Sequence, residues 1–138
     1  MPGEMQSVTL VIPGPPPPSL NHQERLHWAK RKRLREWWAQ QAWLVWLRAG
    51  KPRFERPIIQ YRLYYRTNRL RDADNAIASC KPILDGLKGH AFEDDHSGVV
   101  TILPPVIDVD RERPRVEIVI REARVEGTAL VVDIGRSV

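Results

Sequence analysis

The chain has 138 residues, 42% of them hydrophobic and 28% charged, which is ordinary for one globular domain with a modest core. A single cysteine, Cys80, excludes an internal disulfide framework and a zinc site built from several cysteines. No apolar run approaches the roughly 18 residues that span a bilayer, and the first residues lack a signal-peptide pattern. We therefore expect a cytoplasmic protein without a membrane partner.

The net charge of +5 conceals a strong separation of charge along the chain. Residues 25–71 contain 14 Lys/Arg and two acidic residues, a net of +12, whereas the rest contains 8 basic and 15 acidic residues, a net of −7. A basic segment of this kind favours a phosphate backbone as partner. A solvated basic helix beside acidic loops would account for the same charges.

The first predicted element is a strand over residues 7–12, where β-branched residues alternate with others. The segment PGPPPPSLN follows, and its four consecutive prolines predict an extended surface loop. Either Ser19 or Asn21 is suited to cap the helix that comes next.

Residues 23–48 contain no proline or glycine and predict one long helix that ends near Gly50. Its first half is basic, and apolar positions follow helical spacing from Leu34 onward. The five tryptophans of the chain all belong to this segment. Tryptophans at helical spacing favour a core or a dimer interface, with stacking on nucleic-acid bases as the alternative.

The second half of the chain alternates strands and helix. Residues 56–66 predict a strand with Ile59, Tyr61, Leu63 and Tyr65 on one face. Residues 75–88 predict a helix that Pro82 kinks or divides into two short helices. Further predicted strands cover residues 98–109, broken by Pro104 and Pro105, then 113–122, and a possible last strand over 128–134.

This order of elements predicts one α+β domain over residues 1–138. One long and one shorter helix would pack on a mixed or antiparallel sheet. Residues 122–138 would form a C-terminal extension, for dimerisation or regulation.

The segment RDADNAIASCKPILDGLKGHAFEDD, residues 71–95, gathers carboxylates within a basic protein. Asp72 and Asp74, at the end of a strand, would point to the same side within reach of one cation. A turn after the helix would bring Glu93, Asp94 and Asp95 back toward this pair. Converging carboxylates repel one another unless a divalent metal joins them. Mg²⁺ held there could activate water for phosphodiester hydrolysis.

On an ideal helix, Asp74, Lys81 and Asp85 share one stripe, so Lys81 could stabilise negative charge on a bound phosphate. The neighbouring Arg66, Arg69 and Arg71 could bind adjacent phosphates. Structural alternatives stay open, because Asp72 could cap a turn and Lys81 could pair with Asp85 on the surface.

The ordered motifs DADN, KPILDGL and EDD resemble the D-x-D-N … K … D … D-D signature of RusA-type Holliday-junction resolvases. The segment PPPPSLN is similar to the start of that family, and the similarity spans about residues 7–121. The resemblance implies a RusA-like fold and a homodimeric, Mg²⁺-dependent endonuclease, with Mn²⁺ as a substitute. Its partner would be branched DNA, a four-way junction resolved by paired cuts.

By position, the resemblance implies that Asp72, Asp74 and Asp95 bind metal and are catalytic, with Asp94 and Asp85 as further candidate ligands. Lys81 would be the catalytic lysine, although in the best-known members that lysine lies four residues after the second aspartate, where this chain has Ala78. The predicted DNA-binding residues are Lys30, Arg31, Lys32, Arg33, Arg66, Arg69 and Arg71. The alternatives are a DNA-binding protein without catalysis and a dimeric module that binds protein.

Overall fold

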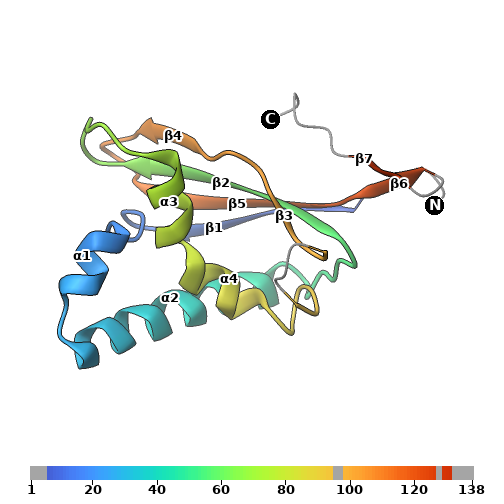
Figure 1. The fold of residues 1–138 in the computed structure, drawn as a ribbon, viewed down its shortest axis with the longest axis horizontal. Coiled ribbons are helices and arrows are strands. Elements are labelled where there is room, and N and C mark those ends of the chain that lie inside the picture. The colour runs from blue at the N-terminus through green and yellow to red at the C-terminus, as the bar shows by residue number, and fades with distance from the viewer. Residues whose placement is uncertain (1–5, 95–97, 127–128, 132–138) are drawn as a thin grey trace.

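The computed structural model describes residues 6–94, 98–126 and 129–131. Within these ranges the chain forms a small α+β domain with four helices and a mixed five-stranded sheet (Figure 1). The helices are α1 (Leu20–Arg25), α2 (Trp28–Arg48), α3 (Ala73–Ser79) and α4 (Lys81–Leu87). The strands are β1 (Ser7–Pro13), β2 (Pro57–Tyr65), β3 (Thr101–Ile102), β4 (Val106–Val109), β5 (Arg115–Glu122), β6 (Arg124–Glu126) and β7 (Ala129–Val131).

The sheet combines antiparallel and parallel pairs. β5 lies between β1 and β2 and is antiparallel to both. On the other side of β2, β3 pairs in parallel near its start and β4 pairs in parallel along its second half. The chain therefore leaves the end of β2 through α3 and α4 and returns to the start of β2. Pro104 and Pro105 separate β3 from β4, as predicted, because proline cannot donate to a sheet ladder.

The core lies between one face of this sheet and the helices. The predicted apolar face of β2 is confirmed, since Ile59, Tyr61 and Leu63 are buried and Tyr65 is half-buried. Alternate residues of the neighbouring strands and one stripe of α2 complete the core: Leu10, Ile12, Val116, Ile118, Ile120, Trp38, Ala42 and Trp46. Burial of each large apolar side chain contributes about 1.5–3 kcal/mol, so this face fixes the register of the sheet.

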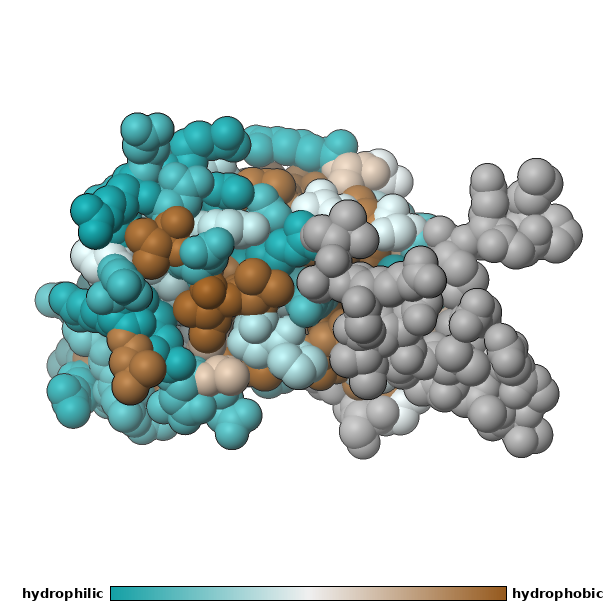
Figure 2. Space-filling view, turned by 90° about the horizontal axis from the view of Figure 1, so that it is seen from above, coloured by the Kyte–Doolittle hydropathy of each residue, from teal (hydrophilic) through white to brown (hydrophobic). Residues whose placement is uncertain are grey.

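The tryptophans of α2 divide into two groups. Trp38 and Trp46 are buried and Trp43 packs against the core, which confirms the predicted packing role for these three. Trp28 and Trp37 are 65% and 46% exposed in the single chain. Seen from above in Figure 2, the end of the molecule that carries α1 is mostly hydrophilic, with hydrophobic residues in small separate patches.

The prediction of one continuous helix over residues 23–48 is wrong. The backbone is extended at Leu26, which ends α1, and His27 begins a new helix by accepting a hydrogen bond from the Ala29 N–H at 3.3 Å. The shorter α1 starts earlier than expected, where Ser19 caps it by accepting from the His22 N–H. The break lets α1 turn away from α2 (Figure 1).

The predicted division of residues 75–88 at Pro82 is confirmed. The chain forms α3 and α4, which meet at Cys80. Pro82 occupies the first turn of α4, where a backbone N–H would have no hydrogen-bond partner within the helix, so proline is tolerated there. Asp74 and Lys81 therefore belong to different helices, and the stripe expected from one ideal helix does not form.

β6 and β7 form a separate hairpin that continues from β5 beyond the main sheet (Figure 1). The remainder of the predicted C-terminal extension, residues 132–138, lies outside the described residues. Among the helices described, none combines the length and the apolar character needed to cross a membrane.

We expect Gly86→Ala to destabilise the fold, although alanine is the better helix former by about 1 kcal/mol. A Cβ at position 86 would overlap the carbonyl oxygen of Ala39 in α2 and lie 2.7 Å from its Cα. This neighbour is backbone and cannot rotate away, so overpacking should cost about 1–3 kcal/mol.

Urea unfolding monitored by tryptophan fluorescence measures this change, with the exposed Gln40→Ala on α2 as control. A Gly86→Ala midpoint equal to or above that of the wild type would contradict the close packing of α2 on α4.

Candidate functional site

A groove of about 660 Å³ lies where the proline segment, α1 and the start of α3 meet. Residues from two distant parts of the sequence, positions 16–25 and 65–79, line it together. Its polar and charged lining residues are Ser19, Asn21, His22, Arg25, Tyr65, Arg69, Arg71, Asp72, Asn75 and Ser79. The groove thus brings the PPPPSLN segment to the RLRDADN segment.

The buried amide of Gln23 holds these two segments together. Its Nε2 donates to the carbonyl of Pro18 at 2.7 Å and to the carbonyl of Ser79, at the end of α3, at 3.3 Å. The Gln23 side chain belongs to α1, and the residue is only 2% exposed. A buried amide is costly unless it is hydrogen-bonded, so this pair of bonds fixes α1 against α3.

Arg71 shapes the loop between β2 and α3. Its guanidinium lies 3.6 Å over the ring of Tyr65, and its Nη1 donates to the carbonyls of Thr67 at 3.0 Å and Arg69 at 3.3 Å. The cation therefore braces the loop from inside, while Arg66 and Arg69 are exposed. Of the three predicted DNA-binding arginines in this loop, Arg66, Arg69 and Arg71, the last two line the groove.

Asp72 and Asp74 lie at the N-terminus of α3 rather than at the end of a strand, because β2 already ends at Tyr65. Asp72 is the N-cap, and its Oδ1 accepts a hydrogen bond from the Asp74 N–H at 3.1 Å. The capping alternative for Asp72 is therefore confirmed. Both residues are exposed, and the positive end of the helix dipole attracts their negative charge.

This donor set fits a hard cation. A carboxylate offers about four lone-pair sites, so the single bond from Asp74 N–H leaves Asp72 able to bind a metal ion. Mg²⁺ commonly takes one or two protein carboxylates and completes its shell with water and phosphate oxygens. Asp72 and Asp74 could supply those two carboxylates.

Lys81 begins α4, and its Nζ lies 3.0 Å from Oδ1 of Asp85. Both side chains are about half exposed, so the alternative prediction of a surface ion pair between Lys81 and Asp85 is confirmed. A pair of this kind contributes about 0.3–0.5 kcal/mol. The pair orients the Lys81 side chain along α4.

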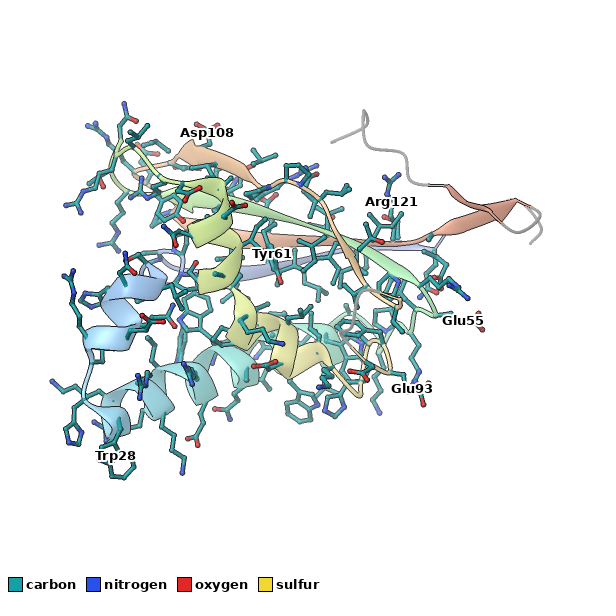
Figure 3. All side chains as sticks on the ribbon, in the orientation of Figure 1. Trp28, Glu55, Tyr61, Glu93, Asp108 and Arg121 are labelled. Carbon is teal, nitrogen blue, oxygen red and sulfur yellow. The ribbon has the colours of Figure 1, made fainter. Side chains whose placement is uncertain are left out.

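The acidic residues that follow α4 lie elsewhere. The Nζ of Lys88, at the end of α4, is 3.6 Å from Oδ1 of Asp94. Glu93 lines a second pocket with Arg53, Phe54 and Glu55, which precede β2 (Figure 3).

Asp72 and Glu93 therefore lie near opposite ends of β2, because the groove that holds Asp72 includes Tyr65, the last residue of that strand. With nine residues at about 3.3 Å each, β2 spans roughly 30 Å. The predicted return of Glu93 and Asp94 toward Asp72 and Asp74 does not occur within one chain. In the described ranges no three His, Cys, Asp or Glu side chains cluster around a possible metal position, and Asp95 lies outside those ranges.

The other predicted DNA-binding residues, at positions 30–33, occupy the first turns of α2. Three of them are exposed, Arg31 is half-buried, and Lys32 lies 3.9 Å from Glu36. In Figure 1, α1 lies between this part of α2 and the loop before α3. No sequence pattern singled out His22 and Arg25, which enter the groove only because a separate α1 forms.

Tyr65 lines the groove, and the buried Cys80 follows Ser79, which also lines it; both side chains are protonated at neutral pH. Burial raises the pKa of the Cys80 thiol to about 12, so at neutral pH this side chain is not a thiolate nucleophile. Burial also raises the pKa of the Tyr65 hydroxyl, and Cys80 adds to this shift while Arg71 opposes it.

We expect Gln23→Leu to lower the free energy of unfolding by about 1–3 kcal/mol, because the buried carbonyl of Ser79 and the partly buried carbonyl of Pro18 lose their donor. The loss should also loosen α1 from α3, which hydrogen exchange of the α1 amides would detect. The matched control is Gln40→Leu, which makes the same change at an exposed position. Equal stability and equal exchange in Gln23→Leu and the wild type would contradict the bracing role of Gln23.

No protein-family model matches this chain, and no curated protein matches it either.

Proposed function

We propose that the protein is a Mg²⁺-dependent endonuclease that resolves four-way DNA junctions as a homodimer, in the manner of RusA-type resolvases. The observation that carries the proposal is the composition of the groove. Two of the motifs of the RusA resemblance, PPPPSLN and DADN, contribute residues to its lining, and Arg25 of α1 joins Arg69, Arg71 and Asp72 there. Cationic side chains beside metal-binding carboxylates are what phosphodiester hydrolysis requires.

In this proposal the DNA backbone enters the groove past Arg25 and Arg69, which neutralise phosphates. The basic first turns of α2, at positions 30–33, bind phosphates of an adjoining arm. These contacts carry no sequence information, so they suit recognition by DNA shape. Binding should weaken steeply as salt rises.

Asp72 and Asp74 would hold the Mg²⁺. When bound, the ion lowers the pKa of a coordinated water and neutralises charge on the scissile phosphate. The hydrogen bond from Asp74 N–H to Asp72 Oδ1 keeps the Asp72 carboxylate at the N-terminus of α3. Lys81, held by Asp85, supplies a cation on the neighbouring helix for the negative charge that develops on the phosphate.

A second copy of the chain completes the site in this proposal. Asp72 and the acidic segment that contains Glu93 and Asp94 lie at opposite ends of β2, so one chain does not bring them together. A two-fold dimer can set the end of one β2 near the start of the other, since such an interface is isologous. Asp72 and Asp74 of one copy would then face Glu93 and Asp94 of the other, and the dimer would have two equivalent sites for paired cuts.

The first test offers a labelled four-way junction to the protein with Mg²⁺. We expect paired cleavage by the wild type and a loss of about 100-fold or more in Asp74→Asn, because a metal-binding carboxylate is removed. Junction binding should persist in that variant, and the exposed Glu112→Gln should cleave like the wild type.

Wild-type protein that binds the junction without cutting it in Mg²⁺ or Mn²⁺ would be a DNA-binding protein and not an enzyme. Full activity in Asp74→Asn would also overturn the proposed site. Absence of any DNA binding at moderate salt would favour the protein-binding alternative.

The second test mixes two inactive variants by co-expression, Asp74→Asn and the double variant Asp94→Asn with Asp95→Asn. If two copies build each site, the mixed dimer keeps one intact site, so nicking should reappear although each parent is inactive. If each chain builds its own site, every site in the mixture carries a lesion. A mixture as inactive as its parents would contradict the shared site.

A further inference from the structure

Leu70 stands at the tip of the loop between β2 and α3 with its side chain fully exposed, at 104% of the reference area. Single exposed leucines are common on protein surfaces, so exposure alone assigns no role to this one. Its surroundings are what distinguish it. Leu70 lies between Arg69 and Arg71 and lines the same groove as both of them and Asp72.

The loop that carries Leu70 is built to hold a fixed shape. The Arg71 guanidinium packs over Tyr65 and donates to the carbonyls of Thr67 and Arg69, which precede the tip. These three contacts close the loop from within and leave the Leu70 side chain outside it. Leu70 is therefore presented on a loop whose backbone is already held, so that binding needs less ordering of the loop.

We propose that Leu70 is a wedge that enters between stacked bases of the bound DNA, next to the phosphate that binds the Mg²⁺ of Asp72 and Asp74. This inference rests on the proposed function and specifies how the site selects its substrate. Proteins often insert apolar side chains between base steps, which unstacks the step and kinks the duplex. Arg69 and Arg71 would hold backbone phosphates beside the opened step.

The wedge explains a preference for branched over linear DNA. Unstacking a base step costs a few kcal/mol, and the cost is smallest where pairing and stacking are already interrupted. Bases at a branch point meet that condition, whereas those of an intact duplex do not. Burial of the leucine between bases then offsets the remaining cost, so the exposed apolar tip favours junctions or flexible steps over regular duplex.

The experiment uses a four-way junction with 2-aminopurine at the branch point, whose fluorescence rises on unstacking. Both proteins carry Asp74→Asn to prevent cleavage, and one also carries Leu70→Ala. We expect the protein with Leu70 to raise the fluorescence several-fold and Leu70→Ala to lose most of that rise, with recovery in Leu70→Met. The ratio of junction to duplex affinity should fall by about tenfold in Leu70→Ala, the scale on which burial of a leucine acts.

Val11→Ala, which changes an exposed apolar residue on β1, is the matched control and should behave like its parent. Because Leu70 is fully exposed, its replacement should not alter folding, and an unchanged thermal transition would verify this. If the Leu70→Ala protein binds the junction and raises the 2-aminopurine fluorescence as much as the protein with Leu70, the wedge is overturned and the proposed function stays intact. Failure of the Leu70 protein to bind junctions at all would overturn the proposed function and the wedge together.

Discussion

The hydrogen bonds of the buried Gln23 amide are the interaction on which the candidate site depends. They join α1 to the proline segment on one side and to the end of α3 on the other. Among the described residues, these bonds are the buried polar contact that connects the two segments lining the groove. The rigid prolines fix one wall, and the loop braced by Arg71 forms the other. A site of charged, solvated side chains is thereby held by a few buried contacts.

The parallel pairing of β3 with β2 explains where the acidic residues lie. A parallel connection must return to the start of the strand it follows. The chain therefore carries Glu93 and Asp94 back past the length of β2, away from Asp72 at its end. The same constraint links dimerisation to catalysis in our proposal, because the single chain holds the two acidic groups at opposite ends of β2 and a second copy would bring them together.

The sequence predicted the α+β class, the buried face of β2 and the division of the helices at Pro82, because alternation and proline act locally. It failed at Leu26 and His27, since histidine is not a usual N-cap and no proline or glycine marks that break. Among the candidate metal ligands, the pattern placed Asp72 and Asp74 at a strand end, whereas both lie at the N-terminus of α3. The presence of Arg25 in the groove and the separation of Asp94 from Asp72 depend on tertiary topology, which local sequence patterns do not contain.

The most direct test of the central claim is the position of Mn²⁺ in crystals of the full chain, located by anomalous scattering. Our account predicts a manganese ion in the groove, bonded to a carboxylate oxygen of Asp72 or Asp74 at about 2.2 Å. It also predicts that Glu93 and Asp94 of the partner subunit lie beside that ion. Manganese bound only at other positions, or a dimer that holds the two acidic groups apart, would contradict the account.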